Sequence, residues 1–162
     1  MTKREYLHEA LTAAGVKKIY KSIKELKHAA GTQYGGILRA ADKPVRAKSK
    51  KSYVDQEGIT QNRDIRYNVE TTYNVVIADA DEDAAEVILE KFLLNLGKGY
   101  ADDHGSWLKV TPEETEWLGE EDNVMKSKVA IQILIRFEYQ LYVDSKMEKL
   151  PDNTTISVEE DT

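Results

Sequence analysis

Several groups of ionisable side chains in this sequence have types and spacings that chemistry could use. The first is a set of carboxylates that match positions one, three, five and twelve of a calcium-binding loop: Asp79, Asp81, Asp83 and Glu90. Such a loop needs glycine at its sixth position for a sharp turn, and Ala84 stands there. Because the same stretch has a helical pattern, we interpret these carboxylates as residues that cap and begin a helix.

A second group suggests a metal site but lacks the required partners. Asp102, Asp103 and His104 lie between glycines, in a stretch typical of a solvated loop. The other histidines, His8 and His28, have no ligand-spaced partner, and the chain has no cysteine to supply a thiolate. We therefore expect no bound metal and no cofactor.

A third group, Glu113, Glu114 and Glu116, resembles the paired carboxylates of a glycosidase. A strand would place Glu114 and Glu116 on one face, but the flanking residues predict no apolar pocket that would raise the pKa of either carboxyl. The sequence also has no glycine-rich phosphate loop and no nucleophile elbow. We interpret these glutamates as a solvated face and expect no enzymatic activity.

The fourth group is a basic stretch, which we take as the candidate interface: Lys43, Arg46, Lys48, Lys50, Lys51 and Tyr53. One interpretation is a solvated hairpin tip, which requires no partner. A second is a short nucleic-acid patch, which the net charge of −6 disfavours. A third is contact with an acidic protein surface.

Two acidic stretches of the same chain could supply that surface. The first comprises Asp79, Asp81, Glu82, Asp83 and Glu86, and the second comprises Glu113, Glu114, Glu116, Glu120 and Glu121. Complementary surfaces at different places on one chain are typical of head-to-tail rings. The charge pattern therefore favours a homo-oligomer.

The elements that must position these groups begin with two short helices. Thr2 with Glu5 forms a capping box before the first helix, which Gly15 ends. A strand follows over 16–21, and Ser22 with Glu25 repeats the capping pattern for a second helix.

The middle of the chain contains a predicted arm. A strand begins over 34–41, the sequence Asp42-Lys43-Pro44 predicts a turn, and Gln56-Glu57-Gly58 predicts another. We expect residues 34–64 to form a long hairpin or arm that is poorly anchored to the core. The alternating stretch 65–77 then predicts a half-buried strand, and the main helix follows it as far as Gly97.

The last part of the chain has the strongest pattern. After a strand over 107–118 that bends at Pro112, the odd positions of 129–143 are apolar and the even ones, including Arg136, are mostly polar. At roughly 3.4 Å per residue that strand would span about 50 Å. A compact chain of this length is only about 40 Å across, so the strand must bend at a bulge or project.

These elements predict an α+β fold with a mostly antiparallel, curved sheet and helices packed on one face, in the order α-β-α-β-β-β-α-β-β. We expect one domain over residues 1–144, with the arm at 34–64 projecting, and a polar acidic tail over 145–162. The length of 162 residues suits one domain, and the 41% hydrophobic share suffices for a core. The absence of cysteine is typical of a reducing cytoplasm. We expect neither a signal peptide nor a membrane span.

The order of elements over residues 10–144 resembles the tail terminator, or tail completion, proteins of long-tailed bacteriophages. The residues that carry the likeness are 18–26, 36–38, 73–77, 84–87, Trp117 and 128–142. The resemblance implies a non-enzymatic ring, usually a hexamer, that caps the tail tube and contacts the head connector. It implies assembly in the host cytoplasm and residence in the virion tail, without a membrane or sequence-specific nucleic acid as partner. The alternatives are another head-tail joining or minor tail protein, a cytoplasmic binding module unrelated to phages, or a small enzyme.

Overall fold

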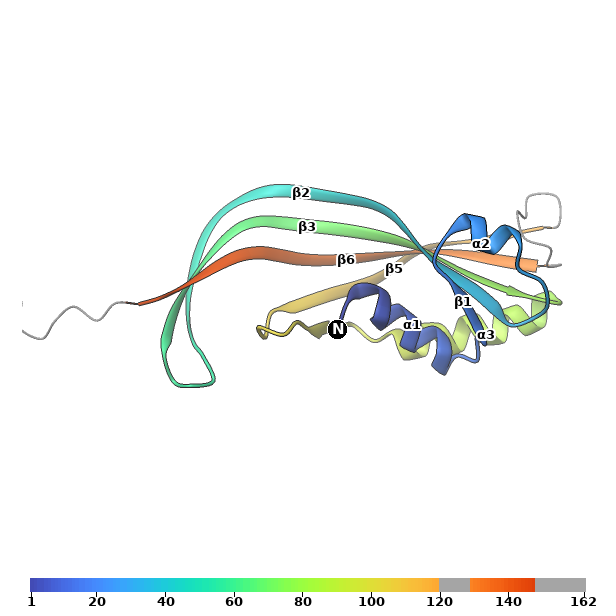
Figure 1. Cartoon of the computed structure of the whole chain (residues 1–162), viewed down its shortest axis with the longest axis horizontal. Helices are drawn as coiled ribbons and strands as arrows, with labels where there is room; N and C mark the ends of the chain where they lie inside the picture. Colours follow the sequence, from blue (N-terminus) through green and yellow to red (C-terminus); the bar gives the residue numbers. More distant parts are fainter. Residues whose placement is uncertain (120–128, 148–162) are drawn as a thin grey trace, which may run out of the picture.

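A computed structural model describes residues 1–119 and 129–147 and contains one curled sheet flanked by helices (Figure 1). The elements in chain order are α1 (Lys3–Ala13), β1 (Lys18–Tyr20), α2 (Ile23–Lys27), β2 (Tyr34–Val54), β3 (Thr60–Asp79), α3 (Glu82–Leu96), β4 (Gly99–Ala101), β5 (Trp107–Leu118) and β6 (Val129–Lys146). The sheet order is β1-β2-β3-β6-β5-β4. β1 pairs with β2 in parallel, and the other pairs are antiparallel. The predicted α+β class and curved sheet are confirmed, whereas the predicted antiparallel character is matched in part, because the parallel β1–β2 pair makes the sheet mixed.

The predicted order of elements is wrong on either side of α3. The turn predicted at Asp42-Lys43-Pro44 does not form, because β2 runs without interruption through these residues. Pro44 lies opposite Val69 of β3, in a part of β2 that has no second strand partner among the described residues, and proline is tolerated in edge strands. After α3, the three-residue strand β4 is too short for the periodicity of the sequence to indicate it.

The helices cover both faces of the sheet, which corrects the prediction that they pack on one. Leu7 and Leu11 of α1 join Phe92 of α3 in the main core, whereas Leu26 of α2 packs in a separate cluster with Val76 and Ala78. Figure 1 shows α1 and α3 below the sheet and α2 above it. The reason lies at the end of β3, where four consecutive residues, 75–78, are all buried and so bury both faces of the strand.

The helix starts form as the sequence predicts. Thr2 and Glu5 make a reciprocal capping box, with the Thr2 amide donating to Glu5 Oε2 over 2.6 Å. Asp81 caps α3 by accepting the Ala84 amide over 2.8 Å, which confirms the capping role of this acidic stretch. Within residues 1–119 and 129–147, no helix is long and apolar enough to cross a membrane.

The alternation predicted for β6 is confirmed over its first half. Ile131, Ile133, Ile135 and Phe137 are fully buried on the face that α1 and α3 cover. The strand then continues past the helices. Leu141 and Val143 are therefore about half exposed, although they occupy odd positions like the core residues. β6 therefore both bends and projects, as its length requires (Figure 1).

Candidate functional site

Three strands leave the body of the protein together and form its most distinctive surface. We call this surface the arm: residues 42–71 of β2, β3 and the turn between them, with residues 139–146 of β6. In Figure 1 the strands extend past α1 and bend at their far end, so that the turn between β2 and β3 lies below the rest of the sheet, at the left of the view. Three paired strands give the arm more support than an isolated hairpin would have.

Irregular pairing accounts for the bend of the arm. The register shifts between Arg39 and Ala41 and between Arg46 and Ser49 in β2, and between Ile65 and Tyr67 in β3. An extra residue in one strand increases the local twist and kinks the strand. The shifts between Arg46 and Ser49 and between Ile65 and Tyr67 both lie within the arm, where such kinks bend the strands.

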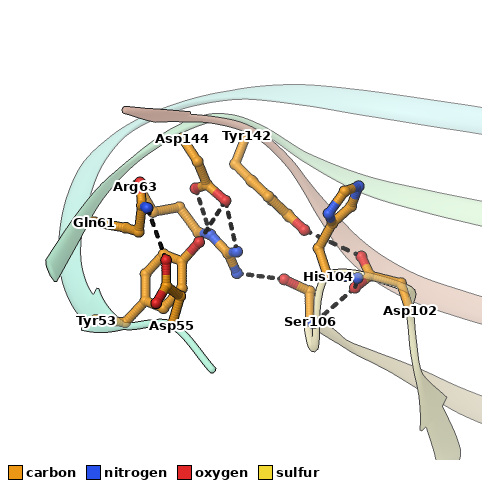
Figure 2. Close-up of polar contacts among 9 residues, drawn as sticks. All are labelled: Tyr53, Asp55, Gln61, Arg63, Asp102, His104, Ser106, Tyr142 and Asp144. Atoms are coloured by element: carbon orange, nitrogen blue, oxygen red, sulfur yellow. Dashed lines mark hydrogen bonds and ion pairs between the residues drawn. The ribbon is translucent and has the colours of Figure 1, made fainter. Parts of the chain in front are cut away.

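An arginine holds the outer strands of the arm together (Figure 2). Arg63 of β3 donates from Nε and Nη2 to the two carboxylate oxygens of Asp144 in β6, each over 2.9 Å. Its guanidinium carbon lies 3.6 Å from the ring centroid of Tyr142 and 4.5 Å from that of Tyr53. Only 12% of the Arg63 side chain is exposed. A planar cation stacked between two rings and paired at both edges has little freedom to move, so this contact rigidifies the arm.

The same arginine attaches the arm to the body. Arg63 Nη1 donates to Ser106 Oγ over 2.5 Å, and the Tyr142 hydroxyl donates to Asp102 Oδ2 over 3.3 Å. Both partners lie in the loop between β4 and β5, far from the arm in sequence (Figure 2). The arm is therefore anchored, which corrects the expectation of a poorly anchored hairpin.

The loop that receives the arm is held by Asp102. Its Oδ1 accepts the backbone amides of His104 over 2.9 Å and Ser106 over 2.7 Å. These bonds shape a tight turn and position the Ser106 hydroxyl toward the arm. In the described residues, no group of three or more His, Asp or Glu is arranged to hold a metal ion.

The basic stretch is divided between different surroundings. Arg46, Lys48 and Lys50 line a hollow of about 620 Å³ with Tyr67. A second hollow of about 520 Å³ is lined by Lys43 and Lys51. None of these five cations forms an ion pair within the part of the chain that the structure describes. Five cations close together on an arm are thus left for solvent or for a partner.

Tyr53, the remaining residue of the candidate interface, has a different role. Its hydroxyl donates to Asp144 Oδ2 over 2.7 Å, and its ring stacks on Arg63. The hydrogen bond to Asp144 raises the pKa of the Tyr53 hydroxyl. Tyr53 is half-buried and belongs to the contacts that hold the arm in shape.

The two acidic stretches also differ in their surroundings. Asp79 is buried and Asp81 caps α3, but Glu82, Asp83 and Glu86 are exposed. In the second stretch Glu113 pairs with Arg136 over 2.8 Å, and Glu114 and Glu116 are exposed. Glu120 and Glu121 lie outside the described residues, as does the predicted tail from residue 148 onward.

The residues that hold the arm are not apparent from the sequence. Arg63, Ser106 and Asp144 are separated by tens of positions, and no local pattern connects them. Alternation places Asp144 on the polar side of β6, which indicates a solvent-facing or paired carboxylate, but it does not identify Arg63 as the partner.

The arm contains three carboxylates whose pKa values are lowered. The Arg63 guanidinium lowers the pKa of Asp144, the Thr71 hydroxyl that of Asp42, and the Gln61 amide that of Asp55. A carboxylate with a lowered folded-state pKa stabilises the fold above its unfolded pKa, and that contribution is lost as the pH falls through the folded value.

We expect acidification to loosen the arm before the body. Nuclear magnetic resonance spectra recorded at decreasing pH should show arm signals shifting and broadening below about pH 4, the usual range of Asp, while α3 signals persist. The Asp144→Asn variant should lose the part of this transition that affects β6. Simultaneous loss of arm and α3 signals at one pH would contradict the prediction.

Comparison with known proteins gives no match to a family model and none to a curated protein. Among solved structures, the chain is similar to the sheath/tube terminator, in its extended state, of PVC, an extracellular contractile injection system. That likeness has a TM-score of 0.56 and 13% identity, and covers 100% of this chain and 64% of that chain. A chain in the virion of a gene transfer agent aligns over 87% of this chain and 95% of its own length, with 9% identity and a TM-score of 0.40, too low to support an argument. This chain spans a little under two thirds of the terminator's length. It shares the fold of a sheath/tube terminator, and the resemblance to tail terminators seen in the sequence is therefore confirmed at the level of fold.

Proposed function

We propose that this protein is a non-enzymatic structural component of the tail terminator type. It forms a ring, with six copies as the expected number, that caps the end of a tail tube and offers its other face to the head connector. The observation that carries the proposal is the fold likeness to a sheath/tube terminator along the whole chain. In a virus this role places the protein in the host cytoplasm during assembly and in the virion tail afterwards.

The arm supports the self-assembly part of the proposal. It projects from the body with cations that form no ion pair among residues 1–119 and 129–147, while separate surfaces of the same chain carry exposed carboxylates. Unlike charges at two different places favour a head-to-tail contact, which closes into a ring when the rotation between copies permits. Exposed ion pairs contribute only about 0.2–1 kcal/mol each, so their main effect is on orientation and association rate.

The proposal is tested by self-association and by binding to tubes. Sedimentation velocity over a concentration series should show a discrete oligomer, and association should slow with added salt without vanishing. Electron microscopy of purified tail tubes incubated with the protein should then show it at tube ends. Tubes alone and tubes with an unrelated acidic protein of similar size are the controls. A protein that stays monomeric and leaves tube ends bare would overturn the proposal.

The second candidate is another head-tail joining or minor tail protein. The same charged arm supports it, because an arm of this kind can contact a different protein as well as a second copy. Decoration along the tube wall, or binding to the connector without binding to tubes, would favour this candidate.

A further inference from the structure

The arm has a hollow whose charge is not balanced within the described chain. The hollow is lined by Arg46, Ala47, Lys48, Lys50, Asp64, Arg66 and Tyr67. Asp64 pairs with Arg66 over 2.9 Å, which leaves three lining cations without an ion pair among residues 1–119 and 129–147. The Arg46 guanidinium lies 5.9 Å from the ring centroid of Tyr67. The hollow therefore presents positive charge beside an aromatic ring.

Exposed apolar side chains lie next to this hollow. Leu141 of β6 is directly opposite Tyr67, and Val143 is directly opposite Asp64. Directly opposite residues of paired strands share one face of the sheet. Leu141 is 47% exposed and Val143 is 53% exposed. The surface thus combines cations with uncovered apolar groups, and apolar side chains exposed beside polar ones mark surfaces that bind proteins.

A partner reaches this surface through side chains and not by adding a strand. Beyond Gly36 the outer edge of β2 has no strand partner in the described chain. That edge contains two register shifts, Pro44 and several lysines, all features that prevent edge-to-edge pairing. The occupant therefore offers its own side chains, with negative charge and apolar groups.

The outward face of α3 combines negative charge with exposed apolar side chains. Its exposed stripe repeats at helical spacing and consists of Asp83, Glu86, Val87, Glu90 and Leu94. The opposite stripe, which includes Ile88 and Phe92, packs in the core. Leu94 is 85% exposed, and the three carboxylates form no ion pair within the described residues.

We propose that the arm hollow of one copy docks on the α3 stripe of a second copy. The inference rests on the proposed self-assembly and assigns its contact surfaces. The two surfaces cannot meet within one chain, because the arm and α3 extend toward opposite ends of the molecule (Figure 1). Their dimensions agree: Arg46 to Lys50 spans about 13 Å along a strand, and Asp83 to Glu90 about 10 Å along a helix.

The second acidic stretch fits the hollow less well. Glu113 is already paired with Arg136, which leaves fewer free carboxylates on β5. Trp117 is exposed there, but it stands on a strand next to a register shift between Pro112 and Thr115. The α3 stripe offers three carboxylates on a helix, and the arm hollow offers three cations; none of the six forms an ion pair in the part of the chain that the structure describes.

Cysteine cross-linking tests this contact directly, because the natural chain has no cysteine. Full-length Lys50→Cys protein is mixed with Glu90→Cys protein and treated with a short bis-maleimide, so that linked heterodimers report only contacts between copies. Linking should be at least about tenfold more efficient than in the matched control mixture of Lys50→Cys with Glu116→Cys on β5. Equal linking in the two mixtures, or preferential linking to β5, would overturn the inference.

Charge reversal provides the second measurement. Lys48→Glu/Lys50→Glu and Glu86→Lys/Glu90→Lys should each lower the association constant about tenfold, and an equimolar mixture of the two variants should associate better than either alone. Circular dichroism checks that both variants fold.

If the natural protein forms rings but the mixture of variants associates no better than either variant alone, the proposed contact is wrong and the proposed function stands. Absence of both rings and tube binding would contradict the proposed function as well. Binding of DNA that Lys48→Glu/Lys50→Glu abolishes, with unchanged self-association, would show that the hollow serves nucleic acid instead.

Discussion

The Ile133→Asp variant should fail to fold. Ile133 is fully buried at the centre of β6, opposite Val75 of β3 and Thr115 of β5, within the main core. An unpaired carboxylate at this position loses its hydration and gains no partner, which costs several kcal/mol. Since typical domains are stable by only about 5–15 kcal/mol, circular dichroism should show loss of the cooperative unfolding transition.

The matched control for this variant is Asn74→Asp. Asn74 lies on the adjacent strand, opposite Leu134, on the other face of the sheet and partly exposed. The same charge there should cost less than about 1 kcal/mol. Ile133→Val, which removes one methylene group, should cost about 1 kcal/mol and gives a measurable value if the aspartate variant cannot be purified. Equal tolerance of aspartate at positions 133 and 74 would show that the assigned faces are wrong.

Alternation alone would suggest Arg136 as the control, since it occupies an even position of β6. The structure shows that Arg136 pairs with Glu113 over 2.8 Å, with both side chains 30% exposed. Arg136→Asp would place two carboxylates side by side and leave Glu113 without its cation. We therefore expect Arg136→Asp to be more damaging than a solvent-facing change, contrary to the prediction from alternation.

The Arg63→Ala variant should release the arm while the body stays folded. The change leaves Asp144 without its cation, removes the stacking between two tyrosine rings and breaks the bond to Ser106. Breaking a buried ion pair costs about 3–5 kcal/mol, and the partial exposure of Asp144 reduces this to about 2–3 kcal/mol. Hydrogen exchange should show lost protection at 60–66 and 142–146, with little change in α3.

Arg66→Ala is the control for the arm. Arg66 belongs to the same strand and also pairs with an aspartate, but its side chain is 59% exposed. Exposed pairs of this kind contribute about 0–1 kcal/mol, so protection of the arm should persist. Arg63→Lys keeps the charge without the two-pronged geometry and should give an intermediate result. The anchoring role of Arg63 would be disproved if Arg63→Ala and Arg66→Ala had the same small effect.

The elements with clear periodicity or caps can be predicted from the sequence. The capping box of Thr2 and Glu5, the cap at Asp81 and the alternation of β6 each depend on residues a few positions apart, so the chain encodes them locally. The same kind of information misled at Asp42-Lys43-Pro44, where residues typical of a turn lie within a strand. Their preference is weak compared with continuous pairing to β3, which decides the local structure there.

Which face each helix covers, and how the arm is held, depend on contacts between segments far apart in the chain. α2 packs on the face opposite α1 and α3 because the end of β3 buries both its faces, and no periodicity in α2 indicates which face it takes. Arg63 finds Asp144 and Ser106 because a register shift and a curled sheet bring distant segments together. Five basic residues close together in sequence are divided between two hollows because continuous pairing to β3 makes this stretch a strand, whose alternation places Lys43 and Lys51 on one face and Arg46, Lys48 and Lys50 on the other. The types of the charged residues are set by the sequence, but their neighbours are set by strand register and sheet curvature, which depend on contacts between residues far apart in the chain.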